Sequence, residues 1–254
     1  MKVLITGAAG FIGSQLLEAL AVQHPEWTLI ASDIRPLNPQ ALRPNVEAAL
    51  LDIGKREAVL AAVAQHQPDA IVHLASVVTP PPGMGEDVLH TIDVEGTRSI
   101  LQAAVEHGVR QLIVTSSGAA YGYYPENAEW IDEHDPLRGH SKFAYAKHKR
   151  EVEEMLAQAR VKHPELRQLI LRPGTILGRH VNNQITDMFK KKAVMGISGS
   201  DSRFVFIWDQ DVVSIIIKGL EKGCSGIFNL AGDGALSLRE IAGVLQKPYR
   251  PLPA

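Results

Sequence analysis

The sequence predicts an α/β fold in which helices cover both faces of a parallel, doubly wound sheet. Segments with helical periodicity alternate with short runs rich in Val, Ile and Leu. These runs are continuously apolar rather than alternating, as expected of strands buried on both faces. The predicted helices end at His-Pro, His-Gln-Pro or His-Gly signals, where proline or glycine stops a helix.

The strands expected before residue 173 are Val3–Ile5, Thr28–Ala31, Val46–Leu50, Ala70–Leu74, Gln111–Thr115 and Gln168–Leu171. Because strands and helical segments alternate along the chain, right-handed crossovers would place these strands side by side in one sheet. Residues 1–172 are therefore expected to form a Rossmann-like core.

The pattern loosens after Arg172, where Pro and Gly interrupt the apolar runs. We expect residues 173–254 to form a small lobe over the carboxyl edge of the sheet, where such folds bind ligands. Its predicted elements are a helix near Gln184–Lys192, a strand Phe204–Trp208, a helix from Asp209, a strand Ile227–Leu230 and a helix from Ser237. The last eight residues contain three prolines and are expected to complete neither helix nor strand, which suggests that the natural chain continues.

Composition excludes several classes of protein. The 254 residues carry 26 basic and 28 acidic side chains, and 45% are hydrophobic, as in an ordinary globular domain with one core. The chain has no excess of basic residues that would indicate a nucleic-acid-binding protein. No apolar run approaches the ~20 residues that span a membrane. Cys224 is the single cysteine, so we expect no intrachain disulfide and a cytoplasmic protein. The ten histidines form no metal-binding pair, so no metal site is expected.

A glycine-rich turn separates the first predicted strand from the first helix. Gly7, Gly10 and Gly13 are spaced three apart, with Phe11 and Ile12 between the last two. Glycine lets the backbone approach a pyrophosphate, and the amino terminus of the helix offers unpaired N–H groups and positive potential. The spacing is G-x-x-G-x-x-G rather than the general G-x-G-x-x-G fingerprint. The turn favours a dinucleotide site.

Acidic residues follow the second and third strands. Asp33 lies about twenty residues after Gly13, where a carboxylate can accept hydrogen bonds from both ribose hydroxyls of NAD and would repel the 2′-phosphate of NADP. We therefore expect NAD as the cofactor, and Arg35 keeps NADP as the less favoured alternative. Asp52, followed by Ile53, could accept from the adenine amino group. Either carboxylate could instead cap a turn or helix.

A tyrosine and a lysine share one helical face. Tyr145 and Lys149 lie four residues apart in a segment with helical periodicity. A tyrosine hydroxyl is a poor base at neutral pH, but an adjacent ammonium and a cationic nicotinamide ring would stabilise the phenolate by Coulomb attraction. Ser116 and Ser117 close the fifth predicted strand, and either hydroxyl could polarise a substrate oxygen or cap the following turn.

Taken in order, these residues resemble the extended short-chain dehydrogenase/reductase family, the NAD-dependent epimerase/dehydratase group. The resemblance covers about residues 1–240. It is carried by Gly7, Gly10 and Gly13, Asp33, Asp52-Ile53, His73-Leu74-Ala75, Val114–Gly122, Tyr145 with Lys149, and Arg172-Pro173.

The resemblance implies roles for individual residues. Matching Tyr121-Gly122 to the family's Tyr-Gly makes Ser117 the catalytic serine, with Tyr145 and Lys149. It also implies that Lys149 bonds the nicotinamide ribose. Further residues implied to contact the cofactor are Leu74, Ala75, Pro173 and Gly174. A homodimer is implied as well, in which a helix from Asp87 to His107 and the helix that carries Tyr145 form a four-helix seam between two copies.

Departures from the family pattern narrow the function. Asp93 stands where the family usually has Asn. Thr175 stands where sugar-nucleotide epimerases have a substrate amide, and Arg203 lies one position from their phosphate-binding arginine. Gly118-Ala119 replaces the Asp-Glu pair of the dehydratases, so elimination is not expected. We keep Ser117, Thr175 and Arg203 as expected substrate contacts.

The expected activity is NAD-dependent interconversion of a secondary alcohol and its ketone, on a small-molecule alcohol or sugar derivative. Two alternatives stay open. One is a sugar-nucleotide epimerase that acts through a transient ketone. The other is a non-catalytic redox sensor that binds NAD or NADP, which would have no need of an activated phenol.

Overall fold

A seven-stranded parallel sheet forms the centre of the protein. The computed structural model describes residues 1–37, 42–181 and 183–253. The strand order is β11-β6-β5-β4-β1-β2-β3, and every neighbouring pair is parallel. The strands are β1 (Lys2–Thr6), β2 (Thr28–Asp33), β3 (Val46–Leu50), β4 (Ala70–His73), β5 (Gln111–Thr115), β6 (Arg167–Pro173) and β11 (Gly226–Leu230). This confirms the predicted fold class.

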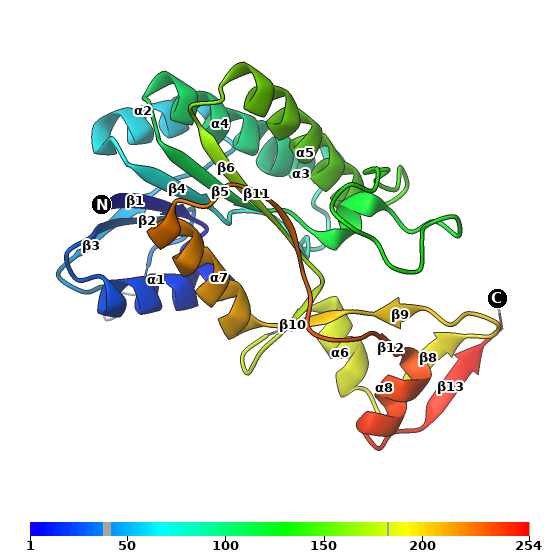
Figure 1. Ribbon diagram of the computed structural model, residues 1–254. Helices are drawn as coiled ribbons and strands as arrows, with labels where there is room; N and C mark the ends of the chain where they lie inside the picture. The colour runs from blue at the N-terminus through cyan, green and yellow to red at the C-terminus, as the bar shows by residue number, and fades with distance from the viewer. Residues whose placement is uncertain (38–41, 182, 254) are drawn as a thin grey trace.

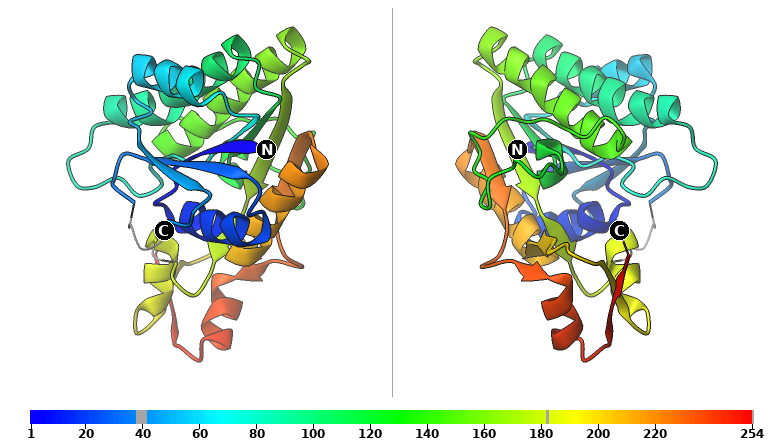
Figure 2. Two further views of the ribbon diagram at one scale, coloured as in Figure 1. Left: turned by 90° about the vertical axis from the view of Figure 1, so that its left-hand side faces the viewer. Right: turned by 90° about the vertical axis from the view of Figure 1, so that its right-hand side faces the viewer.

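Helices cover both faces of this sheet, as Figures 1 and 2 show. Helices α1 (Phe11–Gln23) and α7 (Asp209–Lys222) lie on one face, and α2 (Arg56–His66), α4 (Gly96–Glu106) and α5 (Ala144–Lys162) lie on the other. Successive strand side chains point to opposite faces. Ile5 therefore packs in the core beneath α1 and α7, and Leu4 packs in the core beneath α2, α4 and α5.

The helix expected from Asp87 to His107 contains a π-helical turn. It consists of α3 (Glu86–His90), the π turn η2 (Thr91–Glu95) and α4. Gly96 begins α4, and a Cβ there would lie 3.0 Å from Ile53 Cδ1 and 3.2 Å from the Ile53 carbonyl oxygen. A glycine at this position thus allows the helix to approach the segment after β3, so its packing partner lies within the subunit.

The remaining elements form a smaller lobe, seen at the lower right of Figure 1. They are β7 (Thr175–Leu177), α6 (Gln184–Lys190), β8 (Val194–Ile197), β9 (Arg203–Phe204), β10 (Phe206–Trp208), β12 (Leu236–Ser237), α8 (Leu238–Val244) and β13 (Tyr249–Leu252). Three two-stranded pairs organise it: β7 with β10, β9 with β12, and β8 with β13.

Two of the strands expected after residue 172 differ from the structure. The single strand expected over Phe204–Trp208 is interrupted at Val205, so that β9 pairs with β12 and β10 pairs with β7. The strand expected in the lobe over Ile227–Leu230 is β11, which extends the main sheet beside β6. Residues after 172 are thus shared between sheet and lobe.

The expectation that the last residues complete no strand is wrong. Tyr249–Leu252 forms β13, parallel to β8. Pro251 is tolerated because β13 is an edge strand, where a missing N–H need not remove a ladder bond. Among the described helices, none combines the length and the apolar character that crossing a membrane requires.

The tight turn after β1 gives a stability prediction. A Cβ on Gly13 would collide with the Gly7 carbonyl oxygen and lie 2.9 Å from Ala8 Cα. We expect Gly13→Ala to lower the free energy of unfolding by about 1–3 kcal/mol, measured by urea denaturation. Gly243→Ala is the matched control, because nothing lies within 4 Å of its Cβ position in α8. That variant should be neutral or more stable by up to about 1 kcal/mol; equal losses in both variants would contradict this packing argument.

Candidate active site

The carboxyl ends of four adjacent strands bring the expected site residues to one edge of the sheet. In the order β6-β5-β4-β1, these ends lead into Pro173-Gly174, Ser116-Ser117, Leu74-Ala75 and the glycine turn. The strand order reverses between β1 and β4, and ligands of open α/β sheets bind outside the strand ends at such a point.

The glycine turn is packed directly against the segment that follows β4. Gly7 has φ +73°, and a Cβ there would lie 2.7 Å from the Ala75 backbone nitrogen. The first N–H groups of α1, on Phe11, Ile12 and Gly13, have no partner within the helix by its geometry. This arrangement offers the backbone donors and positive potential that a pyrophosphate requires.

Asp33 lies at the end of β2 and faces the glycine turn. Its Oδ2 accepts from the Ala9 N–H at 3.0 Å, and its Oδ1 accepts from the Arg35 backbone N–H at 3.0 Å and from Nε at 3.3 Å. Arg35 also donates from Nη2 to the Ala9 carbonyl at 3.0 Å, and its side chain is 65% exposed. The carboxylate is thus fixed beside the turn, and it has an arginine as its neighbour.

Asp52 and Ile53, in the segment after β3, lie in different environments. Asp52 Oδ1 accepts from the Gly54 N–H at 3.0 Å, which is the capping geometry that the sequence left open. Ile53 is buried and packs beneath Gly96. Asp52 is 33% exposed, and its second oxygen, Oδ2, lies 4.0 Å from Lys55 Nζ.

Tyr145 and Lys149 are brought together on α5. The Lys149 Nζ lies 5.5 Å from the centre of the Tyr145 ring and donates to the Thr115 carbonyl at 3.2 Å. Lys149 is buried, whereas Tyr145 is half-buried. The ammonium therefore links the tyrosine helix to the end of β5, immediately before the two serines.

The structure gives the two serines different environments. Ser116 is buried, and its hydroxyl donates to Glu153 Oε1 at 2.5 Å. Ser117 is half-buried and caps the short helix η3 (Gly118–Tyr121), where its Oγ accepts from the Ala119 N–H at 3.1 Å. This bond leaves the Ser117 hydroxyl proton available to an oxygen outside the protein.

The segment after β6 packs closely against Val205 and Leu230. A Cβ on Gly174 would lie 2.7 Å from Val205 Cγ2, and the Gly174 N–H donates to the Leu230 carbonyl at 2.9 Å. Thr175 begins β7 directly after it. Arg203 lies farther along, in β9 of the lobe, where its Nη2 is paired with Asp201 at 3.2 Å. Its pairing with Asp201 reduces its availability as an anion contact.

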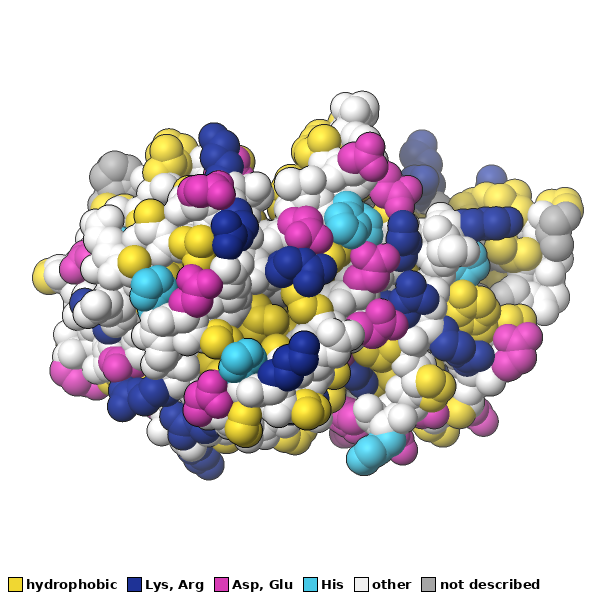
Figure 3. Space-filling model, turned by 90° about the horizontal axis from the view of Figure 1, so that it is seen from above, with side chains coloured by type: hydrophobic (Ala, Val, Ile, Leu, Met, Phe, Trp, Pro, Cys, Tyr) yellow, Lys and Arg dark blue, Asp and Glu magenta, His cyan; other side chains and the backbone are white. Residues whose placement is uncertain are grey.

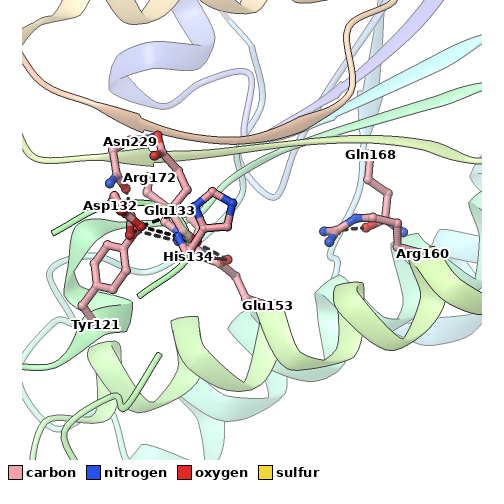
Figure 4. A network of polar contacts seen from close by, with 10 residues as sticks. Tyr121, Asp132, Glu133, His134, Glu153, Arg160, Gln168, Arg172 and Asn229 are labelled. Carbon is pink, nitrogen blue, oxygen red and sulfur yellow. Dashed lines mark hydrogen bonds and ion pairs between the residues drawn. The ribbon is translucent and has the colours of Figure 1, made fainter. Parts of the chain in front are cut away.

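A buried ion pair behind the site was not anticipated from sequence (Figure 4). Arg172 donates to Glu153 through Nε at 2.9 Å and Nη2 at 2.6 Å, and both side chains are almost fully buried. Arg172 Nη1 also donates to the Tyr121 hydroxyl at 2.6 Å. The only sequence signal was Arg172 itself, an arginine in an otherwise apolar strand.

The Tyr121 hydroxyl extends this network to the loop before α5. It lies 2.8 Å from Asn229 Oδ1 and 2.9 Å from the Asp132 carbonyl, either of which can accept its proton. Burial raises the pKa of Tyr121 and outweighs the opposing effect of Arg172. Tyr121 therefore stays a neutral hydrogen-bonding phenol.

His73 joins β1, β4 and α4 beneath the site. Thr97 Oγ1 donates to the Asp93 carbonyl at 2.6 Å and so accepts from His73 Nε2 at 3.0 Å. The Nδ1 atom then accepts from the Thr6 hydroxyl at 2.7 Å. Burial, with the nearby charge of Lys149, lowers the pKa of His73 to about 3, so it is neutral. No group of three or more His, Cys, Asp or Glu suited to a metal occurs among the described residues.

Comparison with known proteins identifies a family match over most of the chain. Residues 3–231 match the NAD dependent epimerase/dehydratase family. An uncharacterized protein of Mycobacterium tuberculosis is 25% identical over 240 residues, which cover 94% of this chain and 64% of that protein. The N-acetyl-alpha-D-glucosaminyl-diphospho-ditrans,octacis-undecaprenol 4-epimerase of Escherichia coli O157:H7 is 32% identical over 199 residues, 76% of this chain and 54% of the relative. The chain thus spans less than two-thirds of the length of these relatives.

Solved structures share the fold. UDP-glucose 4-epimerase from Thermus thermophilus, in complex with NAD, has a TM-score of 0.80 and 24% identity, covering 100% of this chain and 86% of that chain. UDP-glucose 4-epimerase from Thermotoga maritima, with UDP-glucose, has a TM-score of 0.82 and 21% identity, covering 99% and 86%.

The buried ion pair gives a prediction for stability. Arg172→Met leaves the Glu153 carboxylate buried without a cation, and we expect a loss of about 3–5 kcal/mol in urea denaturation. The double variant Arg172→Met, Glu153→Leu removes both charges and should recover most of that loss. A double variant no more stable than the single one would mean that the uncompensated charge is not the cause.

Proposed function

Because this chain belongs to the NAD dependent epimerase/dehydratase family, we propose that it is an NAD-dependent enzyme that interconverts a secondary alcohol and its ketone. The observation that carries the proposal is the placement of Lys149. Its ammonium lies beside the Tyr145 ring and donates to the end of β5, next to the available hydroxyl of Ser117.

The residues at the sheet edge fit NAD. The free N–H groups of α1 would hold the pyrophosphate, and Gly7 keeps that turn free of a side chain. Asp33 would accept from the adenosine ribose, because a carboxylate has about four acceptor positions and some remain beyond its bonds to Ala9 and Arg35. The other residues proposed to line the cofactor are Phe11, Ile12, Asp52, Ile53, Leu74, Ala75, Lys149, Pro173 and Gly174.

Bound NAD would supply an acceptor for the hydride removed from the substrate carbon. The chain's own groups would handle the proton. Tyr145, as a phenolate stabilised by Lys149, takes the proton of the substrate hydroxyl. Ser117 donates its hydroxyl proton to the same oxygen and orients it. In the reverse direction, Tyr145 returns the proton to the oxygen of the ketone.

The fate of the ketone separates two outcomes of this chemistry. If the ketone leaves, the enzyme is a dehydrogenase. If the ketone rotates within the site and is reduced on its other face, the enzyme is an epimerase. The 32% identity to a protein named as a 4-epimerase favours epimerisation as the second candidate. A redox sensor is disfavoured, because a sensor has no use for Ser117, Tyr145 and Lys149 in this arrangement.

Substrate contacts and location complete the proposal. Ser117 and Thr175 lie at the strand ends nearest the proposed nicotinamide site, and Arg203 would contact the substrate through guanidinium N–H groups other than the one paired with Asp201. The substrate class is a small-molecule alcohol or sugar derivative, and we propose a cytoplasmic enzyme on the basis of its single cysteine.

Replacement of the tyrosine tests the proposed chemistry. We expect Tyr145→Phe to lower kcat by at least about 100-fold, because the proton acceptor is lost, while the Kd for NAD changes by less than about twofold. Turnover is measured as NADH formation over a panel of sugars, sugar nucleotides, sterols and small hydroxy compounds, with NAD and NADP in parallel. Tyr249→Phe, in β13 of the lobe, is the control and should keep wild-type turnover. Undiminished turnover in Tyr145→Phe would remove the proposed role, and a strong preference for NADP would contradict that of Asp33.

We also propose a homodimer joined through α4 and α5. Figure 3 views the face that carries these helices and shows acidic and basic side chains interspersed over it. Arg98 of α4 pairs with Glu95 of η2 at 3.0 Å, and Arg150 pairs with Glu154 at 3.5 Å on α5. A seam on this face would therefore be largely polar.

Light scattering at micromolar concentration tests the dimer. We expect a particle of twice the chain's 27.7 kDa, and we expect Arg98→Glu to shift it toward monomer through like-charge repulsion. Lys222→Glu, on the exposed side of α7, reverses a charge on the other face and should leave the dimer intact. A monodisperse wild-type monomer would refute the dimer.

A further inference from the structure

A buried carboxylate holds the turn that follows Ala75 at the proposed cofactor groove. Asp93 lies in the π turn η2, and its side chain is 3% exposed. Its Oδ1 accepts from the Ser76 hydroxyl at 2.9 Å and from the Val77 N–H at 3.0 Å. Both donors are neutral. A buried carboxylate requires more compensation than two neutral donors provide.

The second oxygen of Asp93 faces a buried histidine. His148 Nδ1 lies 3.7 Å from Asp93 Oδ2, and the side chain of His148 is 1% exposed. Within the described residues, neither ring nitrogen of His148 has a hydrogen-bond partner. His148 lies on α5 between Tyr145 and Lys149. The carboxylate and the imidazole therefore face each other, and together they join η2 to α5.

Other charged groups surround the pair on the elements packed against it. On α3, the His90 ring meets that of His148 edge to face with centroids 5.3 Å apart, and Glu86 is paired with Lys147 of α5 at 3.0 Å. On α5, Glu151 Oε2 lies 3.0 Å from His90 Nε2, and Lys149 is directed to the Thr115 carbonyl. On β4, His73 is neutral and bonded to two threonines. His90, Lys147 and Lys149 thus each already have another partner, which leaves His148 to compensate Asp93.

We propose that His148 is protonated and forms a buried charge pair with Asp93, and that this pair positions the Ser76–Val77 turn for binding of the cofactor. The proposal of a positioning role rests on the proposed function, since it concerns the NAD groove. The charge pair itself does not, because it is a property of the folded chain.

The π turn gives the pair its geometry. A π turn widens a helix by one residue and so changes the direction of the side chains in it. Here the helix carries Asp93 toward both the segment after β4 and His148 on α5. If His148 loses its charge, the carboxylate faces no cation and must take up a proton or turn away. Either change weakens its hold on Ser76 and Val77.

The first experiment measures the charge of His148 directly. Long-range ¹H–¹⁵N spectra report whether each imidazole carries one proton or two, and the Asp93→Asn spectrum is compared with that of the wild type. We expect His148 doubly protonated at pH 7 in the wild type and singly protonated in Asp93→Asn. His73 serves as the neutral reference in the same spectrum. A wild-type His148 that matches His73 would overturn the charge pair, whether or not the protein binds NAD.

The second experiment measures the Kd for NAD in a mutant cycle. We expect His148→Gln to weaken NAD binding about tenfold, because Asp93 is left without a cation. Asp93→Asn combined with His148→Gln should return to within about threefold of wild type, because an amide oxygen can still accept from Ser76 and Val77 without needing a counter-charge. His107→Gln, an exposed histidine after α4, is the matched control and should bind as wild type does.

Unchanged affinity in His148→Gln, or a double variant no tighter than His148→Gln, would overturn the positioning role. A wild-type protein that binds no NAD would instead overturn the proposed function, while the spectra would still decide the charge pair. If His148→Gln does not fold, folding of the double variant supports the pair and failure of both opposes it.

Discussion

The buried pair of Arg172 and Glu153 fixes α5, the helix that carries Tyr145 and Lys149, to the sheet. Two opposite charges in a low-dielectric interior stay there only when each compensates the other, so the pair tolerates little relative movement of β6 and α5. Glu153 lies one turn beyond Lys149 and two turns beyond Tyr145 on a continuous helix, whose rise is 1.5 Å per residue. Fixing Glu153 therefore fixes the height at which the other two residues stand above the strand ends.

The same ion pair determines which neighbouring hydroxyl groups are hydrogen-bonded behind the site. Ser116 is drawn inward to Glu153, which leaves Ser117 as the serine with an available hydroxyl proton. Tyr121 is drawn to Arg172 and remains neutral, so Tyr145 is the phenol beside an ammonium. The proposal that Ser117 and Tyr145 carry the chemistry thus rests on how a charge is compensated behind the site.

The chain leaves the main sheet twice, and the residues of these two excursions form the lobe. The chain leaves after β6, returns through α7, adds β11 and leaves again. Both departures start at carboxyl ends of adjacent strands, so the lobe is anchored next to the proposed nicotinamide site. Short two-stranded pairs and short helices form it, and it carries Thr175 and Arg203, two of the positions at which this sequence departs from the sugar-nucleotide epimerases it resembles.

The sequence alone determined the sheet, the glycine turn and the shared face of Tyr145 and Lys149, because apolar runs, helix stops and four-residue spacing are local properties of the chain. Only the tertiary structure decided the interruption at Val205, the place of β11 and the strand β13, since each depends on which distant segment supplies a pairing partner. It also decided the partners of Glu153, Asp93 and His148. A charge gives no local sign of burial, and its counter-ion lies on another element, so the compensation of buried charges becomes visible only once the chain has folded.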